Sequence, residues 1–247
     1  MLEYYARQFR CVEINSTFYH LPDRQTLQHW YASTPDNFRF AVKASRYITH
    51  MKKLRDPENT VAALLDRLAT LGDKLGPVLF QLPPRWHFNA ERLGDFLDTL
   101  SDEFRYAFEF RDHSWLNEQT YALLSQHAVA FCIYELDGFL APKQVTSDFV
   151  YVRLHGPDDA YQGSYDEVTL ANWAAALSTW AANGQAVYCY FDNDQCGYAD
   201  RVRDRRKTRS RMRCAPTGNP ASGVSTGVGA PCRRESGRCK TRCGCRP

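Results

Sequence analysis

Hydrophobic and polar residues alternate along several short segments of this chain. In residues 149–156, F-V-Y-V-R-L-H-G, positions 150, 152 and 154 are apolar, whereas Arg153 and His155 stand at intervening positions. Because strand side chains alternate between two faces, a strand here has one apolar face and one polar face. The apolar face can pack against helices, and the polar face predicts a lumen lined with polar groups.

Seven segments of this kind are predicted to be strands, and apolar residues at helical spacing fill nearly every interval between them. The strands are expected over residues 11–15, 38–44, 77–82, 105–111, 129–135, 149–155 and 186–193. The helices are expected over residues 2–9, 26–32, 59–71, 89–100, 117–126 and 170–182. This alternation of strands and helices favours an α/β fold with a parallel sheet.

Two parallel architectures compete, the open doubly wound sheet and the closed eight-stranded barrel. Strands of an open sheet are covered by helices on both faces and therefore have continuous apolar runs. Here one face of each strand is polar, which favours the (β/α)8 TIM-like barrel. The chain supplies seven strands and begins inside a helix, so we expect the first strand of the barrel to be missing upstream of Met1.

Composition divides the chain into two unlike parts. Residues 1–199 hold 17 Lys and Arg against 25 Asp and Glu, a net charge of −8, whereas residues 200–247 hold 14 against 3, a net charge of +11. An apolar content of 44% supports a substantial core in the first part, which we interpret as one incomplete barrel domain. No run of eighteen apolar residues occurs, so no membrane partner is expected, and a cytoplasmic protein is the default.

The tail, residues 200–247, contains no aromatic residue, no Leu and no Ile, and is therefore predicted to be disordered. Its basic charge could serve a nucleic-acid-binding arm, and zinc binding is a second alternative. The candidate zinc ligands are Cys214, Cys232, Cys239, Cys243 and Cys245. We favour a third interpretation, an out-of-frame translation product, which would also remove the last helix of the barrel. Nucleic acid is then a partner only if the tail is native.

Polar residues gather where the predicted strands end, which is where β/α barrels carry their sites. Buried charges destabilise a protein unless they are paired. These groups must therefore pair with one another in a network or bind a ligand. The candidate catalytic residues are Glu13, Glu109 and His155. We expect Glu13 or Glu109 to exchange protons with His155, since imidazole titrates near neutral pH and burial can raise the pKa of a carboxyl toward that range. The expected substrate-binding residues are Asn15, Lys43, Gln81, Arg111, Arg153, Asp192 and Asn193.

This set of residues indicates a hydrolase, lyase or isomerase that acts on a small polar or anionic molecule. A divalent-metal enzyme using Glu13, Glu109, His155 and Asp192 is an alternative, which the three nearby cations disfavour. A non-catalytic protein that binds a small molecule is another. The chain has no G-x-G-x-x-G, no phosphate-binding G-x-x-x-x-G-K and no C-x-x-C, so no cofactor is expected.

Six motifs carry a resemblance to a known family. In chain order they are V-E-I-N-S-T-F-Y, F-R-F-A-V-K-A, G-P-V-L-F-Q-L-P-P, F-E-F-R-D-H-S-W, V-R-L-H-G-P and Y-F-D-N-D. Residues 1–199 resemble the YecE-like family, known as domain of unknown function 72 (DUF72). The resemblance implies a TIM-like barrel and no established activity. Family members usually begin with a strand bearing Thr-Ser-Gly-Trp, which this chain lacks, and end in an ordinary helix, from which it departs after Ala199.

Overall fold

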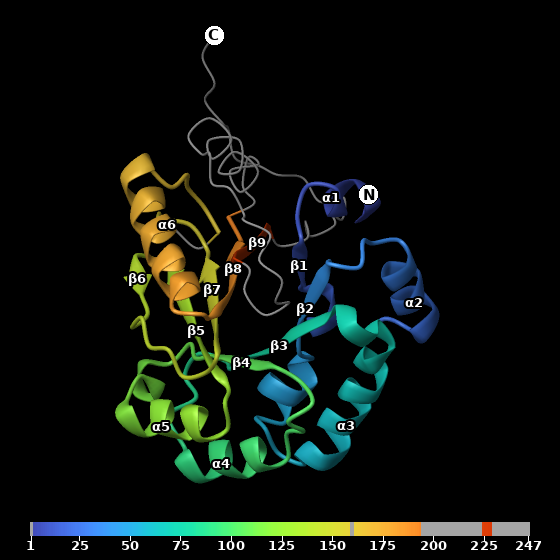
Figure 1. Cartoon of the computed structure of the whole chain (residues 1–247). Helices are drawn as coiled ribbons and strands as arrows, with labels where there is room; N and C mark the ends of the chain where they lie inside the picture. The colour runs from blue at the N-terminus through green and yellow to red at the C-terminus, as the bar shows by residue number, and fades with distance from the viewer. Residues whose placement is uncertain (1, 159–160, 194–223, 229–247) are drawn as a thin grey trace, which may run out of the picture.

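The computed structural model describes residues 2–158, 161–193 and 224–228. Its strands form one sheet that curls into a nearly closed barrel (Figure 1). Around the barrel the parallel strands are β1 (Cys11–Ile14), β2 (Arg39–Lys43), β3 (Leu75–Gln81), β4 (Tyr106–Glu109), β5 (Ala130–Leu136), β7 (Phe149–Leu154), β8 (Ala186–Phe191) and β9 (Val224–Val228). The seven predicted strands and their parallel arrangement are confirmed. A short strand that the sequence did not indicate, β6 (Phe139–Leu140), pairs antiparallel with β5.

Helices cover the outside of the barrel (Figure 1). They are α1 (Leu2–Ala6), α2 (Arg24–Ala32), α3 (Pro57–Leu68), α4 (Ala90–Asp98), α5 (Glu118–Gln126) and α6 (Glu167–Ala182). Four of them begin at side-chain caps, in which an Asp or Asn oxygen accepts a backbone N–H three residues on. The capping residues are Asp23, Asn89, Asn117 and Asp166. The cap at Asp166 explains why α6 begins three residues before its predicted start.

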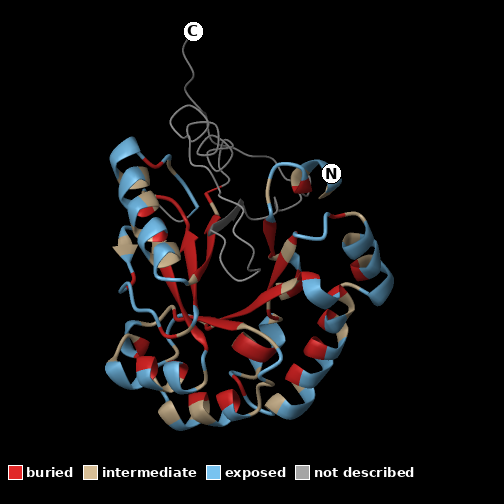
Figure 2. Cartoon of the chain, in the orientation of Figure 1, coloured by how far each residue is buried: buried red, intermediate tan, exposed pale blue. Residues whose placement is uncertain are grey.

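The main core lies between the strands and the helices. Aromatic side chains on the outer faces of neighbouring strands pack there, as Phe80 and Phe108 do with ring centroids 5.2 Å apart. Phe96 of α4 meets Phe80 edge-on at 5.1 Å. Figure 2 shows the strands of the barrel mostly buried and the helices buried mainly on the side that faces them. The apolar faces predicted for the strands are therefore the faces that hold the helices.

A second, smaller core fills the inside of the barrel. Its members are mostly small or aromatic, and they are Cys11, Ala41, Leu79, Ala107, Ala130, Cys132, Phe149, Tyr151, Ala186, Tyr188 and Tyr190. The prediction of a lumen lined with polar groups is therefore wrong for its lower part, because the inside of a closed barrel is packed in layers. Inside the barrel, the buried charged side chains Glu13, Glu109 and Arg153 lie toward the carboxyl ends of the strands. The inner face of β5, which the sequence left unassigned, carries Ala130 and Cys132.

Strand β9 comes from the tail for which disorder was predicted. It pairs in parallel with β8, with Val187 opposite Val224 and Phe191 opposite Val228, and it also lies beside β1. Its V-S-T-G-V sequence is rich in β-branched residues, which favour strands, and this explains the difference from the prediction. The rest of residues 200–247, including the predicted zinc ligands and the predicted loss of the last helix, lies outside the described residues.

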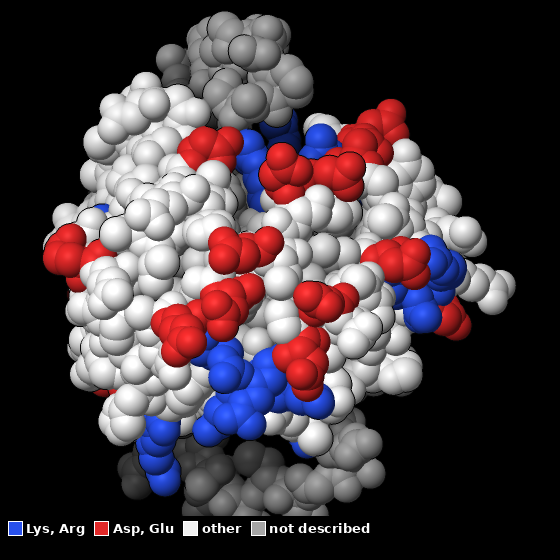
Figure 3. Space-filling model, turned by 90° about the horizontal axis from the view of Figure 1, so that it is seen from below, with Lys and Arg blue, Asp and Glu red and all other residues white. Residues whose placement is uncertain are grey.

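The outer surface carries charges of both signs. On the face seen from below, acidic side chains are spread over the surface, and basic side chains form a large group toward the lower edge and smaller groups elsewhere (Figure 3). Among the described residues, no helix is both long enough and apolar enough to cross a lipid bilayer.

Candidate functional site

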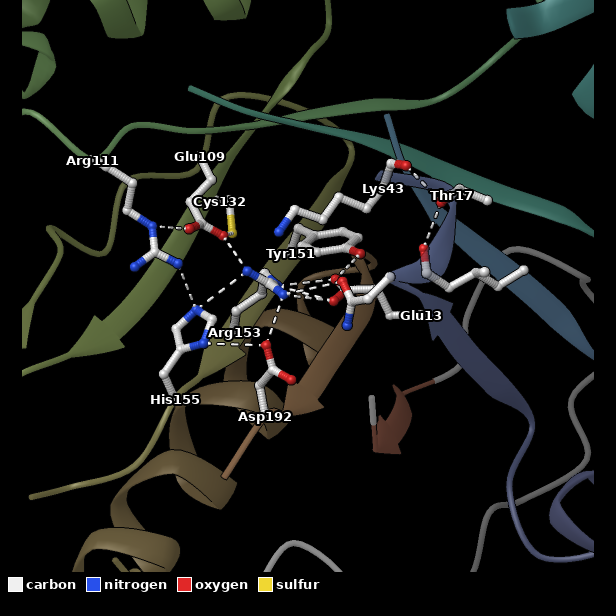
Figure 4. Close-up of polar contacts among 12 residues, drawn as sticks. Glu13, Thr17, Lys43, Glu109, Arg111, Cys132, Tyr151, Arg153, His155 and Asp192 are labelled. Carbon is white, nitrogen blue, oxygen red and sulfur yellow. Dashed lines mark hydrogen bonds and ion pairs between the residues drawn. The ribbon is translucent and has the colours of Figure 1, made fainter. Parts of the chain in front are cut away.

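Arg153 on β7 is the centre of the charged cluster at the carboxyl ends of the strands (Figure 4). Its side chain is 1% exposed, and its Nη2 donates to Glu13 Oε1 at 2.8 Å. Nη1 donates to Glu109 Oε2 at 2.8 Å, and Nη2 also reaches Asp192 Oδ2 at 2.9 Å. Arg153 thus joins carboxylates from β1, β4 and the end of β8. A planar guanidinium with five N–H donors suits this arrangement.

Two carboxylates of the cluster, Glu109 and Asp192, are ionised at neutral pH. Burial opposes ionisation of Glu109, but Arg111 and Arg153 outweigh it and lower the pKa of that carboxyl well below its usual range. Burial likewise opposes ionisation of Asp192, and Arg153 and His155 outweigh it and lower its pKa to about 2. Glu13 accepts a hydrogen bond of 2.6 Å from the hydroxyl of Tyr151 in addition to those from Arg153.

His155 lies between two guanidinium groups and a carboxylate. Its Nε2 is 3.0 Å from Nη2 of Arg111 and 3.3 Å from Nη1 of Arg153. Because guanidinium nitrogens only donate, Nε2 must be the unprotonated nitrogen, and the proton is on Nδ1. Burial, reinforced by Arg153, lowers the pKa of His155, so the ring is neutral at pH 7.

The other ring nitrogen of His155 faces Asp192. Nδ1 lies 3.3 Å from Oδ2 of Asp192 and makes no hydrogen bond with the described residues. Contacts of this kind commonly tighten when a substrate binds. Figure 4 shows the ring held between Arg111 on one side and Asp192 on the other. The arrangement presents a neutral imidazole with one nitrogen directed at a cation and the other at an anion.

Arg111 follows β4 and connects the cluster to the outer rim of the barrel. Its Nε donates to Oε1 of Glu109, and its guanidinium lies 4.9 Å from the ring centroid of Tyr134. The side chain is 8% exposed, compared with 1% for Arg153. Arg111 is therefore the guanidinium of the cluster that solvent can reach more readily.

Lys43, the last residue of β2, lies beside the cluster, and its charged atom lacks a polar partner among the described residues. Among the described residues, no hydrogen bond or ion pair reaches its Nζ, which lies 4.5 Å from the ring centroid of Phe18. Burial and then Arg153 lower the pKa of Lys43 to about 8. The Lys43 carbonyl accepts a 2.7 Å hydrogen bond from Thr17, which ties the turn after β1 to the end of β2.

The structure brings most of the predicted site residues together. Polar contacts join Glu13, Asn15, Glu109, Arg111, Arg153, His155 and Asp192, with Asn15 at the edge, 3.5 Å from Arg153. Three predicted residues do not join this set: Lys43, whose Nζ has no hydrogen-bond or ion-pair partner among the described residues, Gln81 and Asn193. Gln81 is half-buried at the end of β3, where it pairs in register with Glu109, but among the described residues its side chain makes no hydrogen bond to the cluster. Asn193 is buried and donates to the carbonyl of Gly163 at 2.9 Å, so it holds the chain that follows β7.

Besides Thr17, Phe18 and Tyr134, which contact Lys43 or Arg111, three residues that were not predicted as site residues contact the cluster. Tyr151 bonds to Glu13, and the thiol of Cys132 lies 3.7 Å from Oε2 of Glu109. Tyr161 packs edge-on against His155, with ring centroids 5.2 Å apart, and has a positive φ of 65°. Alternation along β7 could have identified Tyr151, whereas no sequence signal marked the loop position of Tyr161.

The arrangement does not support the metal-binding alternative. In the described parts of the chain, no group of three or more His, Cys, Asp or Glu side chains is placed to hold a metal ion. The guanidinium of Arg153 occupies the point where Glu13, Glu109 and Asp192 converge. A cation would have to displace it.

Together, the parallel strands, the helices around them and the charged cluster at the strand ends define a TIM-like β/α barrel with a polar site at the usual end. A family model described as "Protein of unknown function DUF72" matches residues 1–220, and the chain belongs to this family. The resemblance seen in the sequence is thereby confirmed.

Curated relatives cover different shares of the chain. The UPF0759 protein YecE of Escherichia coli (strain K12) is 39% identical over 119 residues, which are 44% of this chain and 41% of YecE. The chain therefore matches about two fifths of the length of that relative. The UPF0759 protein YunF of Bacillus subtilis (strain 168) is 24% identical over 231 residues, 80% of this chain and 82% of YunF.

Solved structures share the fold. A DUF72 family protein from Thermotoga maritima MSB8 superposes with a TM-score of 0.71 at 26% identity, covering 81% of this chain and 84% of that protein. A DUF72 family protein from Enterococcus faecalis V583 gives a TM-score of 0.75 at 21% identity, covering 84% and 92%. These likenesses establish the barrel and leave its chemistry to be argued from the site.

Proposed function

We propose that the protein is an acid/base enzyme, a hydrolase, lyase or isomerase, that acts on a small anionic or polar molecule bound at the carboxyl ends of the strands. The observation that carries the proposal is the position of His155, a buried neutral imidazole between Arg111 and Asp192. A histidine oriented by a carboxylate is a common general base. His155 is here the group that accepts the proton.

Binding of the substrate anion releases Nε2 of His155 from its hydrogen bond with Arg111. A carboxylate or phosphate forms stronger, charge-assisted hydrogen bonds with a guanidinium than a neutral imidazole does. When Nη2 of Arg111 turns to such an anion, the lone pair on Nε2 of His155 becomes available for a substrate proton. Arg111 remains tethered through its Nε to Glu109. Asp192 then stabilises the imidazolium that forms.

Glu13 and Glu109 receive a different role from the proton exchange expected from the sequence. Both oxygens of Glu109 contact guanidinium nitrogens, of Arg111 and Arg153, and the carboxyl stays ionised. Glu13 is held by Arg153 and Tyr151. These contacts support a positioning role for the two glutamates, which fix the guanidinium groups around the substrate.

Solvent-deuterium exchange tests the proposal. The full chain is incubated in D₂O with a panel of small oxo acids, hydroxy acids and sugar phosphates, and NMR follows deuterium entering the substrate. Wild-type protein is expected to exchange at least one compound, and His155→Ala to bind that compound without exchanging it. His127→Ala is the matched control, because His127 also faces an aspartate, Asp98 at 3.6 Å, on the surface. Undiminished exchange by His155→Ala would refute the role of His155.

A non-catalytic binding protein is the second candidate. It is favoured by the fact that Glu13, Glu109 and Nε2 of His155 all have partners within the protein. In that case the same anions bind through Arg111, and no compound of the panel exchanges or turns over. Binding that is lost in Arg111→Met, together with no exchange by wild type, would select this candidate over the enzyme.

A further inference from the structure

We propose that Lys43 is a nucleophilic lysine that forms an imine with a small carbonyl compound bearing a carboxylate or phosphate. This inference rests on the proposed function, because the anionic part of the substrate is held by Arg111. It narrows the substrate class from small anions in general to oxo acids and oxo phosphates. It also gives Lys43 a covalent role, where the sequence suggested only binding.

The surroundings of Lys43 differ from those of the cations in the cluster. Arg153 contacts three carboxylates, and Arg111 contacts Glu109. Figure 4 shows Lys43 reaching from β2 toward Glu109 and Arg153, yet among the described residues its Nζ has no hydrogen-bond or ion-pair partner. A lysine whose role was to neutralise the carboxylates would contact one of them. The position leaves Nζ available to a ligand.

The physical state of Lys43 also suits a nucleophile. An amine attacks only in its neutral form, and desolvation of a lysine is one of the known ways to increase that form. Burial and Arg153 lower the pKa of Lys43 to about 8. At pH 7 Lys43 is then neutral in about a tenth of the protein molecules, whereas a lysine exposed to water is neutral in less than about a thousandth of them.

The reaction balances without an oxidant or reductant. The lone pair on Nζ forms a bond to the carbonyl carbon, Nζ gives up one of its two protons, and the carbonyl oxygen takes one to give a carbinolamine. The carbon–oxygen bond then breaks, the oxygen leaves as water with a second proton taken from solvent, and the nitrogen lone pair forms the C=N bond of a protonated imine. The protonated imine withdraws electrons from the neighbouring carbon. His155 can therefore remove a proton there, which connects this step to the proposed acid/base chemistry.

Reductive trapping tests the imine. The full chain is incubated separately with pyruvate, glyoxylate and glycerone phosphate in sodium cyanoborohydride, which reduces imines selectively. Intact mass measures how many adducts form, and peptide mapping of the wild-type protein locates them. We expect one adduct, on Lys43, formed at least tenfold faster than on any other lysine. Lys43→Arg should abolish it, whereas the exposed-lysine variants Lys53→Met and Lys143→Met should keep it.

The outcomes separate this inference from the proposed function. Lactate has the carboxylate but no ketone or aldehyde group that could form an imine. Its binding, measured by calorimetry, therefore reports on the anion site alone. If lactate binds through Arg111 and no adduct forms on Lys43, the imine is refuted and the anion site stands. If an adduct maps to Lys43 while His155→Ala exchanges deuterium normally, the imine is supported and the role of His155 is refuted. Adducts spread evenly over surface lysines count against the imine, whatever happens to the variants.

Discussion

Replacing Lys43 with methionine should stabilise the fold at neutral pH, although Lys43 lies in the candidate site. The pKa of Lys43 falls from its usual value of 10.5 to about 8 in the folded protein. A difference of this size corresponds to about 3 kcal/mol of destabilisation when the lysine is charged in both states. Methionine has a similar length, needs no hydrogen-bond partner and can pack against Phe18. The free energy of unfolding should therefore rise by up to about 3 kcal/mol at pH 7.

The gain should depend on pH in a defined direction. Below about pH 8, the folded and unfolded chains both carry a charged Lys43, and the full destabilisation is present. Between about pH 8 and 10.5 the folded lysine loses its proton while the unfolded one keeps it, so the wild type becomes relatively more stable. At pH 10 the advantage of Lys43→Met should have fallen below about 1 kcal/mol.

Urea unfolding of wild type, Lys43→Met and Lys53→Met at pH 7 and pH 10 provides the assay. Lys53 is exposed, so its replacement is a control for the loss of one positive charge and should change stability by less than about 0.5 kcal/mol. Two results would show that burial of the charged Lys43 does not destabilise the fold. One is a destabilised Lys43→Met at pH 7, and the other is a gain that is equal at both pH values.

Two further predictions concern stability. Arg153→Met should destabilise the fold by about 3–5 kcal/mol, because it leaves Glu13, Glu109 and Asp192 without their shared partner. Arg24→Met, which breaks an exposed pair with Asp66, should change stability by less than about 1 kcal/mol, and urea unfolding that gave equal losses would contradict this account. Gly156→Ala should destabilise by about 1–3 kcal/mol, because Gly156 has a φ of 113° and an added Cβ would collide with the Gln162 carbonyl. Gly94→Ala, with open space inside α4, should instead stabilise by about 0.5–1 kcal/mol, and thermal unfolding distinguishes the two signs.

The central residues of the cluster were predictable because alternation along a strand is a local property. Arg153 and His155 share the polar face of residues 149–156, and Glu13 stands on the matching face of β1. Once the strands are parallel and closed into a barrel, these faces must converge at one end. The sequence therefore indicated which side chains meet, even though they lie up to 140 residues apart.

The details that decide the chemistry depend on long-range geometry and could not be predicted. Alternation shows that Lys43 faces inward, but not that its Nζ lies 4.5 Å from the ring centroid of Phe18 without pairing with a carboxylate among the described residues. Asn193 follows Asp192 directly, so the two residues turn to opposite sides, and only Asp192 joins the cluster. The pairing of Val224–Val228 with β8 depends on an open strand edge, which no local pattern reveals.

Solvent-deuterium exchange by the wild-type protein and by His155→Ala tests the central claim most directly, because it asks whether the buried imidazole moves a proton. We expect the wild-type protein to exchange deuterium from solvent into at least one small anionic compound. We also expect a loss of at least about a hundredfold in His155→Ala with binding retained, as for removal of a general base. Exchange at the wild-type rate by His155→Ala, with the same compound bound, would contradict this claim.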